Sequence, residues 1–376
     1  MPQTAIVVGA GILGLATARA LAVRGYQVTV FERHAMATGA SIRNFGMVWP
    51  VGQPQGALYE RAIFSRHTWQ QVAAEANIWT DPVGSLHLAY HADEWQVMEE
   101  FAAAAGSYRN VALLTPAATL AKSPAARPDG LLGALWSSEE LIVESRQAVG
   151  QVAAWLREKY GVAFHWNTAI SRIEYPAVYS GKRTWSADQL YVCSGADFET
   201  LYPETFLEIP ITKCKLQMLR LRAQPGHWRI GPALCGGLSL THYTAFQVAP
   251  SLAALKARYA AQYPEYVKWG IHVMASQNHS GELTIGDTHE YGLLQDPFDR
   301  EALNELVMDY LATFTQFKDY TRLQSWNGTY AKMQNGATEF IHSPEPGVTI
   351  LNAPSGAGMT LSFGLAEEVV TGKYKF

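Results

Sequence analysis

The stretch Ala5-Ile6-Val7-Val8-Gly9-Ala10-Gly11-Ile12-Leu13-Gly14 decides the fold of this chain. Its first four residues are apolar, which is typical of a strand buried on both faces of a parallel sheet. The glycines have the spacing GxGxxG: the first allows a tight turn, the second leaves room for a pyrophosphate, and the third lets a helix pack closely. A helix that begins here directs free backbone N–H groups at phosphates. The stretch therefore predicts a dinucleotide site.

The residues that follow complete the pattern. An amphipathic helix is expected up to Gly25, and a second apolar run, Val28 to Phe31, ends in Glu32. A carboxylate at this point accepts hydrogen bonds from ribose hydroxyls and disfavours a 2′-phosphate, which favours FAD or NAD over NADP. A glycine-rich turn in an unrelated α/β protein is the alternative. The order of strand, glycines, helix, strand and acid favours the dinucleotide site.

Length and composition limit the other possibilities. The chain has 376 residues, 48% of them hydrophobic, and a formal charge of −4. These values favour two folded domains and give no general basis for binding nucleic acid or a membrane surface. The three cysteines form no CxxC pair, so no metal site is expected. No apolar run is long enough to span a membrane and the N-terminus lacks a basic segment, so a cytoplasmic location is expected.

A second glycine-rich turn lies near the other end of the chain. A strand is expected at Val348–Ala353, followed by Pro354-Ser355-Gly356-Ala357-Gly358-Met359-Thr360 and a helix from Leu361 to Gly372. This turn again directs backbone N–H groups and a helix N-terminus at an anionic group. Both ends of the chain are therefore expected to fold into one cofactor domain.

Between these motifs, Thr38 to Pro50 is predicted to be a long polar loop. With it, the chain resembles the D-amino-acid-oxidase-like family of FAD-dependent oxidoreductases, the group of glycine oxidase and sarcosine oxidase. The resemblance implies non-covalent FAD, because no cysteine falls where sarcosine oxidases attach flavin. The residues implied or predicted to bind FAD are Gly9, Gly11, Ile12, Leu13, Gly14, Glu32, Arg33, Ala40, Ser41, Arg43, Asn44, Gly46, Ile170, Gly195, Gly356, Gly358, Met359 and Thr360.

The expected fold class is α/β: a Rossmann-like FAD-binding domain with a parallel sheet and helices, and a substrate domain with a mainly antiparallel sheet. Residues 1–80, 143–205 and 321–376 are assigned to the first domain, and residues 81–142 and 206–320 to the second. The runs at 270–275 and 282–286 predict a hairpin. Asp299 is expected to cap a helix from Arg300 towards Phe317. Cys193 is interpreted as a buried thiol.

The substrate residues depart from the family pattern. Simple amino-acid oxidases of this family carry a Trp-x-Gly-x-Arg-Pro-like stretch, whereas this chain has Trp326-Asn327-Gly328-Thr329-Tyr330-Ala331-Lys332-Met333. Arginine binds a carboxylate with two parallel hydrogen bonds, whereas lysine is a point charge that suits a phosphonate or phosphate. With Gly236 to Tyr243, the stretch resembles a subgroup linked to 2-aminoethylphosphonate breakdown. The substrate-binding candidates are Trp49, His242, Tyr243, Tyr330 and Lys332.

Other residues near these candidates have ordinary interpretations. His242 and Tyr243 also fit a purely structural pair. His272 is interpreted as structural, and Lys213 and Lys215 as solvated charges, with part of an anion site as the alternative for the two lysines.

The predicted reaction is oxidation of a small amine that carries an acidic group, by hydride transfer to flavin N5. 2-Aminoethylphosphonate and its N-methyl derivative are the leading candidates. No catalytic base is assigned, because the amine can arrive neutral. The second partner is O2 or another electron acceptor, and the oligomeric state stays open. The alternatives are an oxidase of glycine, sarcosine or a D-amino acid, an NAD-dependent dehydrogenase, and a non-catalytic flavin-binding assembly factor.

Overall fold

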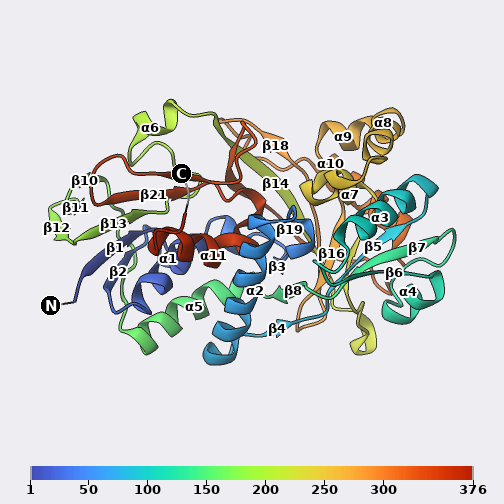
Figure 1. The fold of residues 1–376 in the computed structure, drawn as a ribbon, viewed down its shortest axis with the longest axis horizontal. Helices are drawn as coiled ribbons and strands as arrows, with labels where there is room; N and C mark the ends of the chain where they lie inside the picture. Colours follow the sequence, from blue (N-terminus) through green and yellow to red (C-terminus); the bar gives the residue numbers. More distant parts are fainter. Residues whose placement is uncertain (1, 375–376) are drawn as a thin grey trace.

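The structure is a computed structural model that describes residues 2–374. It consists of two halves, each built on its own large sheet (Figure 1). The N-terminal and C-terminal segments lie together in one half, and the middle of the chain supplies most of the other. The α/β class with a parallel sheet and a second, mainly antiparallel sheet is confirmed.

The first half contains a six-stranded sheet in the order β20-β21-β13-β1-β2-β9. All neighbours are parallel except β20, which is antiparallel to β21. The strands are β1 (Thr4–Val8), β2 (Gln27–Phe31), β9 (Ala163–His165), β13 (Gln189–Val192), β20 (Phe340–His342) and β21 (Val348–Asn352). Alternate residues of β1 enter different cores: Ala5 and Val7 face one cluster and Ile6 faces another. Burial on both faces explains why the central residues of this strand, Ala5 to Val7, are all apolar.

Helices from both ends of the chain cover one face of this sheet. α1 (Ile12–Ala22) lies beside α11 (Gly358–Val370), with α2 (Ala57–Ala76) and α5 (Ser145–Tyr160) next to them (Figure 1). The other core includes residues of a three-stranded antiparallel sheet made of β10 (Arg172–Glu174), β11 (Ala177–Ser180) and β12 (Arg183–Ser186). The two ends of the chain therefore fold into one layered unit, as predicted.

The second half contains a nine-stranded sheet in the order β18-β14-β17-β16-β15-β5-β7-β6, with β19 also paired to β14. All its pairs are antiparallel except β15 with β5. The strands are β5 (Ser85–Ala89), β6 (Val111–Leu114), β7 (Gly133–Ser137), β14 (Ile211–Leu221), β15 (Ala233–Cys235), β16 (Met274–Gln277), β17 (Leu283–Gly286), β18 (Glu290–Tyr291) and β19 (Arg322–Met333). Their main core also includes residues of α3 (Ala92–Ala105), α7 (Leu238–His242), α8 (Leu252–Gln262) and α10 (Glu301–Phe314).

Shorter elements complete the two halves. A small sheet combines β3 (Met47–Val48), β4 (Thr80–Asp81) and β8 (Leu141–Val143). The short helices are α4 (Pro116–Lys122), α6 (Pro203–Leu207) and α9 (Pro264–Lys268).

Several local expectations need correction. β19 pairs with β14 along its whole length, so it belongs to the second sheet although residue 321 was the expected start of a cofactor-domain segment. The helix α10 begins at Glu301, with Arg300 and not Asp299 at its N-cap, and it ends at Phe314. Lys215 is not solvated, because its ammonium group is buried and donates to the Asp296 carbonyl at 2.8 Å. The hairpin of β16 and β17 is confirmed.

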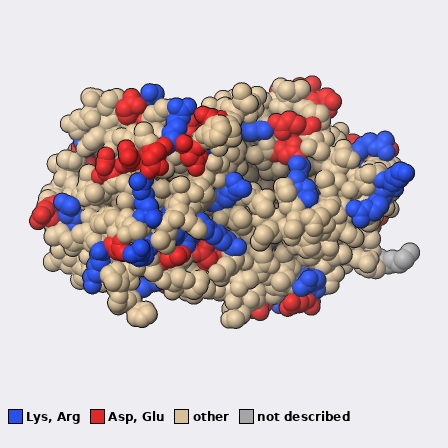
Figure 2. All heavy atoms as spheres, turned by 180° about the vertical axis from the view of Figure 1, so that it is seen from behind, with Lys and Arg blue, Asp and Glu red and all other residues tan. Residues whose placement is uncertain are grey.

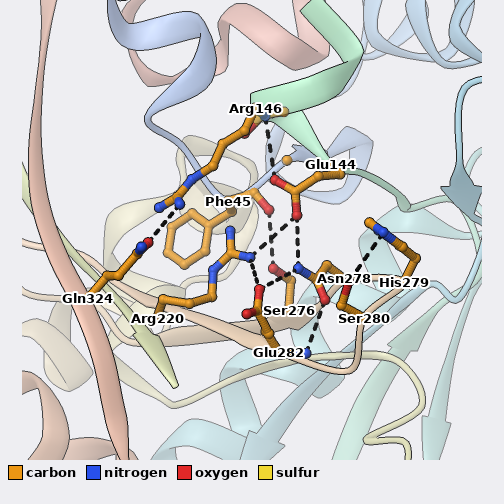
Figure 3. A network of polar contacts seen from close by, with 12 residues as sticks. Phe45, Glu144, Arg146, Arg220, Ser276, Asn278, His279, Ser280, Glu282 and Gln324 are labelled. Atoms are coloured by element: carbon orange, nitrogen blue, oxygen red, sulfur yellow. Dashed lines mark hydrogen bonds and ion pairs between the residues drawn. The ribbon is translucent and has the colours of Figure 1, made fainter. Parts of the chain in front are cut away.

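A buried polar network joins the halves (Figure 3). Arg220 from β14 contacts Glu282 at 2.8 Å and Glu144, at the start of α5, at 3.4 Å. Asn278, in the β16–β17 turn, donates to Glu144 at 2.9 Å. Ser276 donates to the Phe45 carbonyl at 3.1 Å, which ties the loop after β2 to the second sheet. The network therefore sets how the cofactor loop lies against the substrate half.

The outer surface carries both signs of charge. Acidic and basic side chains are interspersed on the face shown in Figure 2. Within residues 2–374, no helix has the length and apolar character needed to cross a membrane.

Candidate functional site

A cavity of about 640 Å³ lies where the two halves meet, and residues of both line it. Gly11, in the first glycine turn, and Gly358, in the last, are both on its wall. A Cβ atom on Gly358 would lie 3.7 Å from the Ile12 side chain, so the two turns are neighbours. The predicted convergence of the two chain ends is therefore present in the fold.

The first glycine turn leaves no space for side chains. Gly9 has a φ of 104°, and a Cβ atom there would lie 2.3 Å from the Cys193 carbonyl oxygen. A Cβ atom on Gly14 would lie 1.9 Å from the Gly9 carbonyl oxygen. These approaches allow α1 to begin directly against the carboxyl end of β1, so that its N-terminus faces the cavity. The turn has the shape that a pyrophosphate requires.

Glu32 supports this turn from the end of β2. Its carboxylate is buried and accepts a hydrogen bond from the Ala10 amide at 3.0 Å and from the His34 amide at 3.1 Å. Both bonds fix the carboxylate on the cavity wall. The fixed carboxylate retains acceptor capacity for a ribose hydroxyl, because each oxygen has two lone pairs.

The loop from Thr38 to Pro50 lies along the cavity. Ser41 accepts a hydrogen bond from the Ile12 amide at 2.9 Å, and Arg43 donates to the Asn327 carbonyl of β19 at 3.1 Å. Gly46 lies just outside the lining: a Cβ atom there would meet the Val143 carbonyl oxygen of β8 at 1.9 Å. Because Gly46 has no side chain, the loop can pack closely against β8 behind the cavity wall.

The last glycine turn closes the cavity from the other side. α11 begins at Gly358, directly after the turn, and its first residues line the cavity. The Thr360 hydroxyl accepts a hydrogen bond from the Trp49 amide at 2.9 Å, which joins this helix to the polar loop. A thirteen-residue helix places partial positive charge at its N-terminus. This end of the cavity is suited to a group that gains negative charge.

The structure brings the predicted residues together in this one cavity. All the substrate candidates line it: Trp49, His242, Tyr243, Tyr330 and Lys332. All the FAD candidates line it except Gly46: Gly9, Gly11, Ile12, Leu13, Gly14, Glu32, Arg33, Ala40, Ser41, Arg43, Asn44, Ile170, Gly195, Gly356, Gly358, Met359 and Thr360. Arg33 forms an ion pair with Asp197 at the edge of the dinucleotide half.

The sequence analysis did not place His272, Asp287 and His289 among the site residues, yet all three line the cavity. His272 Nε2 lies 3.0 Å from Asp287 Oδ1, so the interpretation of His272 as merely structural misses its position on the cavity wall. One available signal was the predicted hairpin. Its strands are antiparallel, so His272, before β16, and His289, after β17, lie at the same open end.

Burial shifts the pKa values of these groups in opposite directions. Burial lowers the pKa of His289 to about 4, against the opposing effect of Asp287. Burial alone raises the pKa of Asp287, but the charges of His289 and His272 outweigh it and hold that pKa below its ordinary value. Burial raises the pKa of Tyr330 well above its ordinary value, so the phenol stays protonated. Near neutral pH the wall therefore carries an ionised Asp287 beside a neutral His289.

Comparisons with known proteins agree with this geometry. The family model described as FAD dependent oxidoreductase (DAO) matches residues 4–371. Glycine oxidase from Bacillus cereus has a similar structure, with a TM-score of 0.77 and 15% identity over 99% of this chain and 96% of that one. L-proline dehydrogenase from P. horikoshii has a TM-score of 0.78 and 18% identity over 100% and 95% of the two chains. At these identities, the likeness concerns the fold.

A curated relative extends beyond this chain. The tRNA 5-methylaminomethyl-2-thiouridine biosynthesis bifunctional protein MnmC of Polaromonas naphthalenivorans is 33% identical over 182 residues. The match covers 46% of this chain and 27% of that protein. The matched part of this chain thus spans about a quarter of the relative's length.

Proposed function

Because this chain belongs to the family of FAD-dependent oxidoreductases, we propose that it oxidises the carbon–nitrogen bond of a small amine with an acidic group. 2-Aminoethylphosphonate and its N-methyl derivative are the proposed substrates. The observation that carries this proposal is Lys332 on the cavity wall, in the β19 stretch where simple amino-acid oxidases of the family have arginine. A lysine ammonium binds a compact oxyanion as a point charge and lacks the fork that matches a carboxylate.

FAD is the cofactor, and the cavity wall fits it. The side-chain-free turn at Gly9 and Gly14 and the N-terminus of α1 suit the pyrophosphate. The fixed Glu32 carboxylate suits a ribose, and the N-terminus of α11 suits the flavin ring. When bound, FAD supplies an acceptor for the hydride that leaves the carbon next to the substrate nitrogen.

The flavin is proposed to be held without a covalent bond. Cys193 is the cysteine on the cavity wall within residues 2–374, and it is buried at the end of β13. Burial raises the pKa of its thiol to about 12. A thiol that stays protonated is a poor nucleophile. Acid denaturation should therefore release free FAD.

The substrate end of the cavity combines aromatic walls with polar groups. The rings of Trp49 and Tyr243 have centroids 6.3 Å apart, and both line the cavity. Apolar ring surface excludes water from the reacting carbon and keeps a neutral amine from gaining a proton. Lys332 holds the acidic end of the substrate by charge. The residues thus bind and orient the amine, and none is assigned as a base.

The test is anaerobic bleaching of the bound flavin by a panel of amines. Glycine, sarcosine, D-alanine, 2-aminoethylphosphonate and its N-methyl derivative are added to the yellow protein. We expect the aminophosphonates to bleach the flavin fastest. Bleaching by the carboxylates alone would contradict the proposed substrate and return the chain to the simple amino-acid oxidases.

A matched pair of variants sharpens this test. Lys332→Met should raise the KM for the acidic amine about tenfold and leave kcat nearly unchanged, because the charge contributes to binding. Lys213→Met is the control, since Lys213 pairs with Glu199 and does not line the cavity. Equal KM values for the two variants would remove Lys332 from the substrate site.

A further inference from the structure

Three histidines gather at the substrate end of the cavity. His242 ends α7, His272 precedes β16, and His289 lies between β17 and β18. Their ring centroids are 3.7 Å apart for His242 and His272 and 5.3 Å apart for His272 and His289. One nitrogen atom of each ring lies within 4.8 Å of the others. Three separate segments of the chain thus build one cluster on the cavity wall.

In His289 and in His272, one ring nitrogen contacts a protein group and the other ring nitrogen has no protein partner within residues 2–374. His289 Nδ1 lies 2.9 Å from the Gly270 carbonyl oxygen, so its N–H donates there and leaves Nε2 available. His272 Nε2 faces Asp287, and its Nδ1 is buried with no hydrogen-bond partner within residues 2–374. A buried polar atom without a partner is costly, so a ligand is the simplest explanation for it.

Basic groups outnumber acidic ones around this cluster. Lys332 lines the same cavity, and its Nζ donates to the Tyr291 hydroxyl at 3.1 Å. Its charge acts on both His242 and His289. Asp287 is the carboxylate that faces the rings, and it is already engaged with His272. The cluster thus contains one carboxylate, one ammonium group and three imidazoles that can take up protons. This combination suits an anion.

A metal ion explains this arrangement less well. His242 and His272 are stacked, with 30° between their planes, whereas the rings of metal ligands point their nitrogen atoms at a common centre. The Lys332 ammonium also repels a cation. Stacked rings instead present their nitrogen atoms side by side, which suits the several oxygens of one headgroup.

We propose that His242, His272, His289 and Lys332 form a subsite for a doubly charged tetrahedral oxyanion of the phosphonate or phosphate class. This subsite deepens the proposed function and rests on it for the amine end of the substrate. With the imidazoles protonated, the three rings and the ammonium offer four donors to a three-oxygen headgroup, whereas a planar carboxylate offers two oxygens. The cluster therefore selects the class of acid that the substrate carries.

Proton uptake accompanies binding in this subsite. The His242 ring faces the open cavity but is surrounded by protein, and this desolvation, followed by the charges of His272, His289 and Lys332, holds its pKa well below its ordinary value. Burial likewise lowers the pKa of His289 to about 4. Both rings are therefore neutral near neutral pH, and an entering dianion raises their pKa values because it stabilises the protonated forms. Binding must then strengthen as pH falls.

Among the other titratable groups around the cluster, Glu140 acts on Tyr243 and has a pKa that burial raises to about 7, and the groups named next do not change charge near neutral pH. Burial lowers the pKa of His87 on β5 to about 3 and raises that of Cys214 on β14 to about 12. Burial also raises the pKa values of the tyrosines Tyr243, Tyr291 and Tyr330 above their ordinary value. Asp287 stays ionised because its pKa is lowered. A proton uptake that the histidine substitutions reduce therefore belongs to the histidine cluster and not to Glu140.

The test is calorimetric titration of the FAD-loaded protein with sulfate, methylphosphonate and acetate. None of these has an amine, so binding is measured without turnover. Sulfate keeps two charges throughout the range from about pH 6 to about pH 8, so any pH dependence belongs to the protein. We expect sulfate and methylphosphonate to bind with proton uptake, seen as a heat that depends on the buffer's ionisation enthalpy. For each proton taken up on binding, the Kd for sulfate should become roughly tenfold larger with each unit by which the pH is raised.

Two variants and a control locate the effect. His242→Gln and His289→Gln should each weaken sulfate binding by at least about tenfold and reduce the proton uptake. His279→Gln is the control, because His279 is an exposed histidine in the β16–β17 turn, outside the cavity lining. The flavin absorbance spectrum and the unfolding temperature report whether each variant stays folded.

The outcomes separate this inference from the proposed function. Acetate binding as tight as sulfate binding, no proton uptake, or one tightly bound transition metal per chain would overturn the oxyanion subsite. If sulfate fails to bind while aminophosphonates still bleach the flavin, the subsite is wrong and the proposed function stands. If sulfate binds with proton uptake while no amine bleaches the flavin, the subsite stands and the proposed function is wrong.

Discussion

Glu140 shows how one buried side chain links this fold to pH. The residue follows β7, and its carboxylate accepts hydrogen bonds from the Val51 amide at 3.0 Å and the Ser85 hydroxyl at 2.9 Å. Within residues 2–374 no lysine or arginine forms an ion pair with this carboxylate, so burial dominates its pKa. Burial raises the pKa of Glu140 from 4.5 to about 7, although the hydrogen bonds from serines and from Val51 oppose the shift. The folded state therefore favours the protonated carboxyl group.

The sign of the pH effect follows from this shift. Below about pH 4.5 the Glu140 carboxyl is protonated in both the folded and unfolded states, so the pKa shift does not change the free energy of unfolding. As pH rises the folded state loses stability, and the loss is complete above about pH 7. Glu140→Gln should remove this pH-dependent loss of stability, because glutamine does not ionise. At about pH 8 the variant should therefore be more stable than the natural protein by on the order of 3 kcal/mol.

Urea unfolding of the FAD-loaded protein, followed by tryptophan fluorescence at several pH values, checks this prediction. The difference between the two proteins should shrink towards about pH 5. Glu174→Gln is the control, because Glu174 is exposed and pairs with Arg172 on the surface. A stability difference that does not change with pH would show that Glu140 is ionised throughout.

At the scale of elements, the helix α1 depends on a close backbone approach. A Cβ atom on Gly14 would lie 1.9 Å from the Gly9 carbonyl oxygen, and backbone cannot move aside as a flexible side chain can. Gly150, in the middle of α5, is exposed and has no atom within 4 Å of the same added group. A side chain would therefore clash with backbone at Gly14 and would meet open space at Gly150.

Alanine substitutions separate the two cases. Gly14→Ala should destabilise the fold by about 1–3 kcal/mol through overpacking and lower the affinity for FAD. Gly150→Ala should stabilise it by roughly 0.5–1 kcal/mol, because alanine favours the helix. Thermal unfolding and the yield of bound flavin after gel filtration check both. Retention of full flavin content by Gly14→Ala would contradict the close packing described for the turn.

At the scale of the whole molecule, a buried polar network connects the two halves. Arg220 is buried between Glu144 of the cofactor half and Glu282 of the substrate half (Figure 3). Removing the arginine would leave Glu144 buried without its cation. Breaking a buried ion pair is far more costly than breaking a surface one.

Arg220→Met should therefore lower the free energy of unfolding by about 3–5 kcal/mol. Arg172→Met is the matched control: Arg172 pairs with Glu174 on the surface, and its loss should cost less than about 1 kcal/mol. Chemical denaturation measures both. Similar losses for the two variants would mean that the network does not hold the halves together.

The cofactor half of the molecule was predictable from the sequence because its determinants are local. The turn at Gly9 to Gly14 and the turn at Pro354 to Thr360 each lie within a few consecutive residues, so the glycine pattern that permits them can be recognised locally. The carboxylate of Glu32 follows its strand at once. The family, the fold class and FAD followed from these motifs.

The substrate half was decided by tertiary structure. β19 joins the second sheet by pairing with β14 across about a hundred intervening residues, and no local pattern specifies that partner. Lys215 appears as a surface charge in the sequence, yet the loop at Asp296 to Phe298 covers it. The histidine cluster requires α7, the approach to β16 and the exit from β17 to meet at one point. A lone histidine has no local signature, because its role depends on neighbours that only the folded chain supplies.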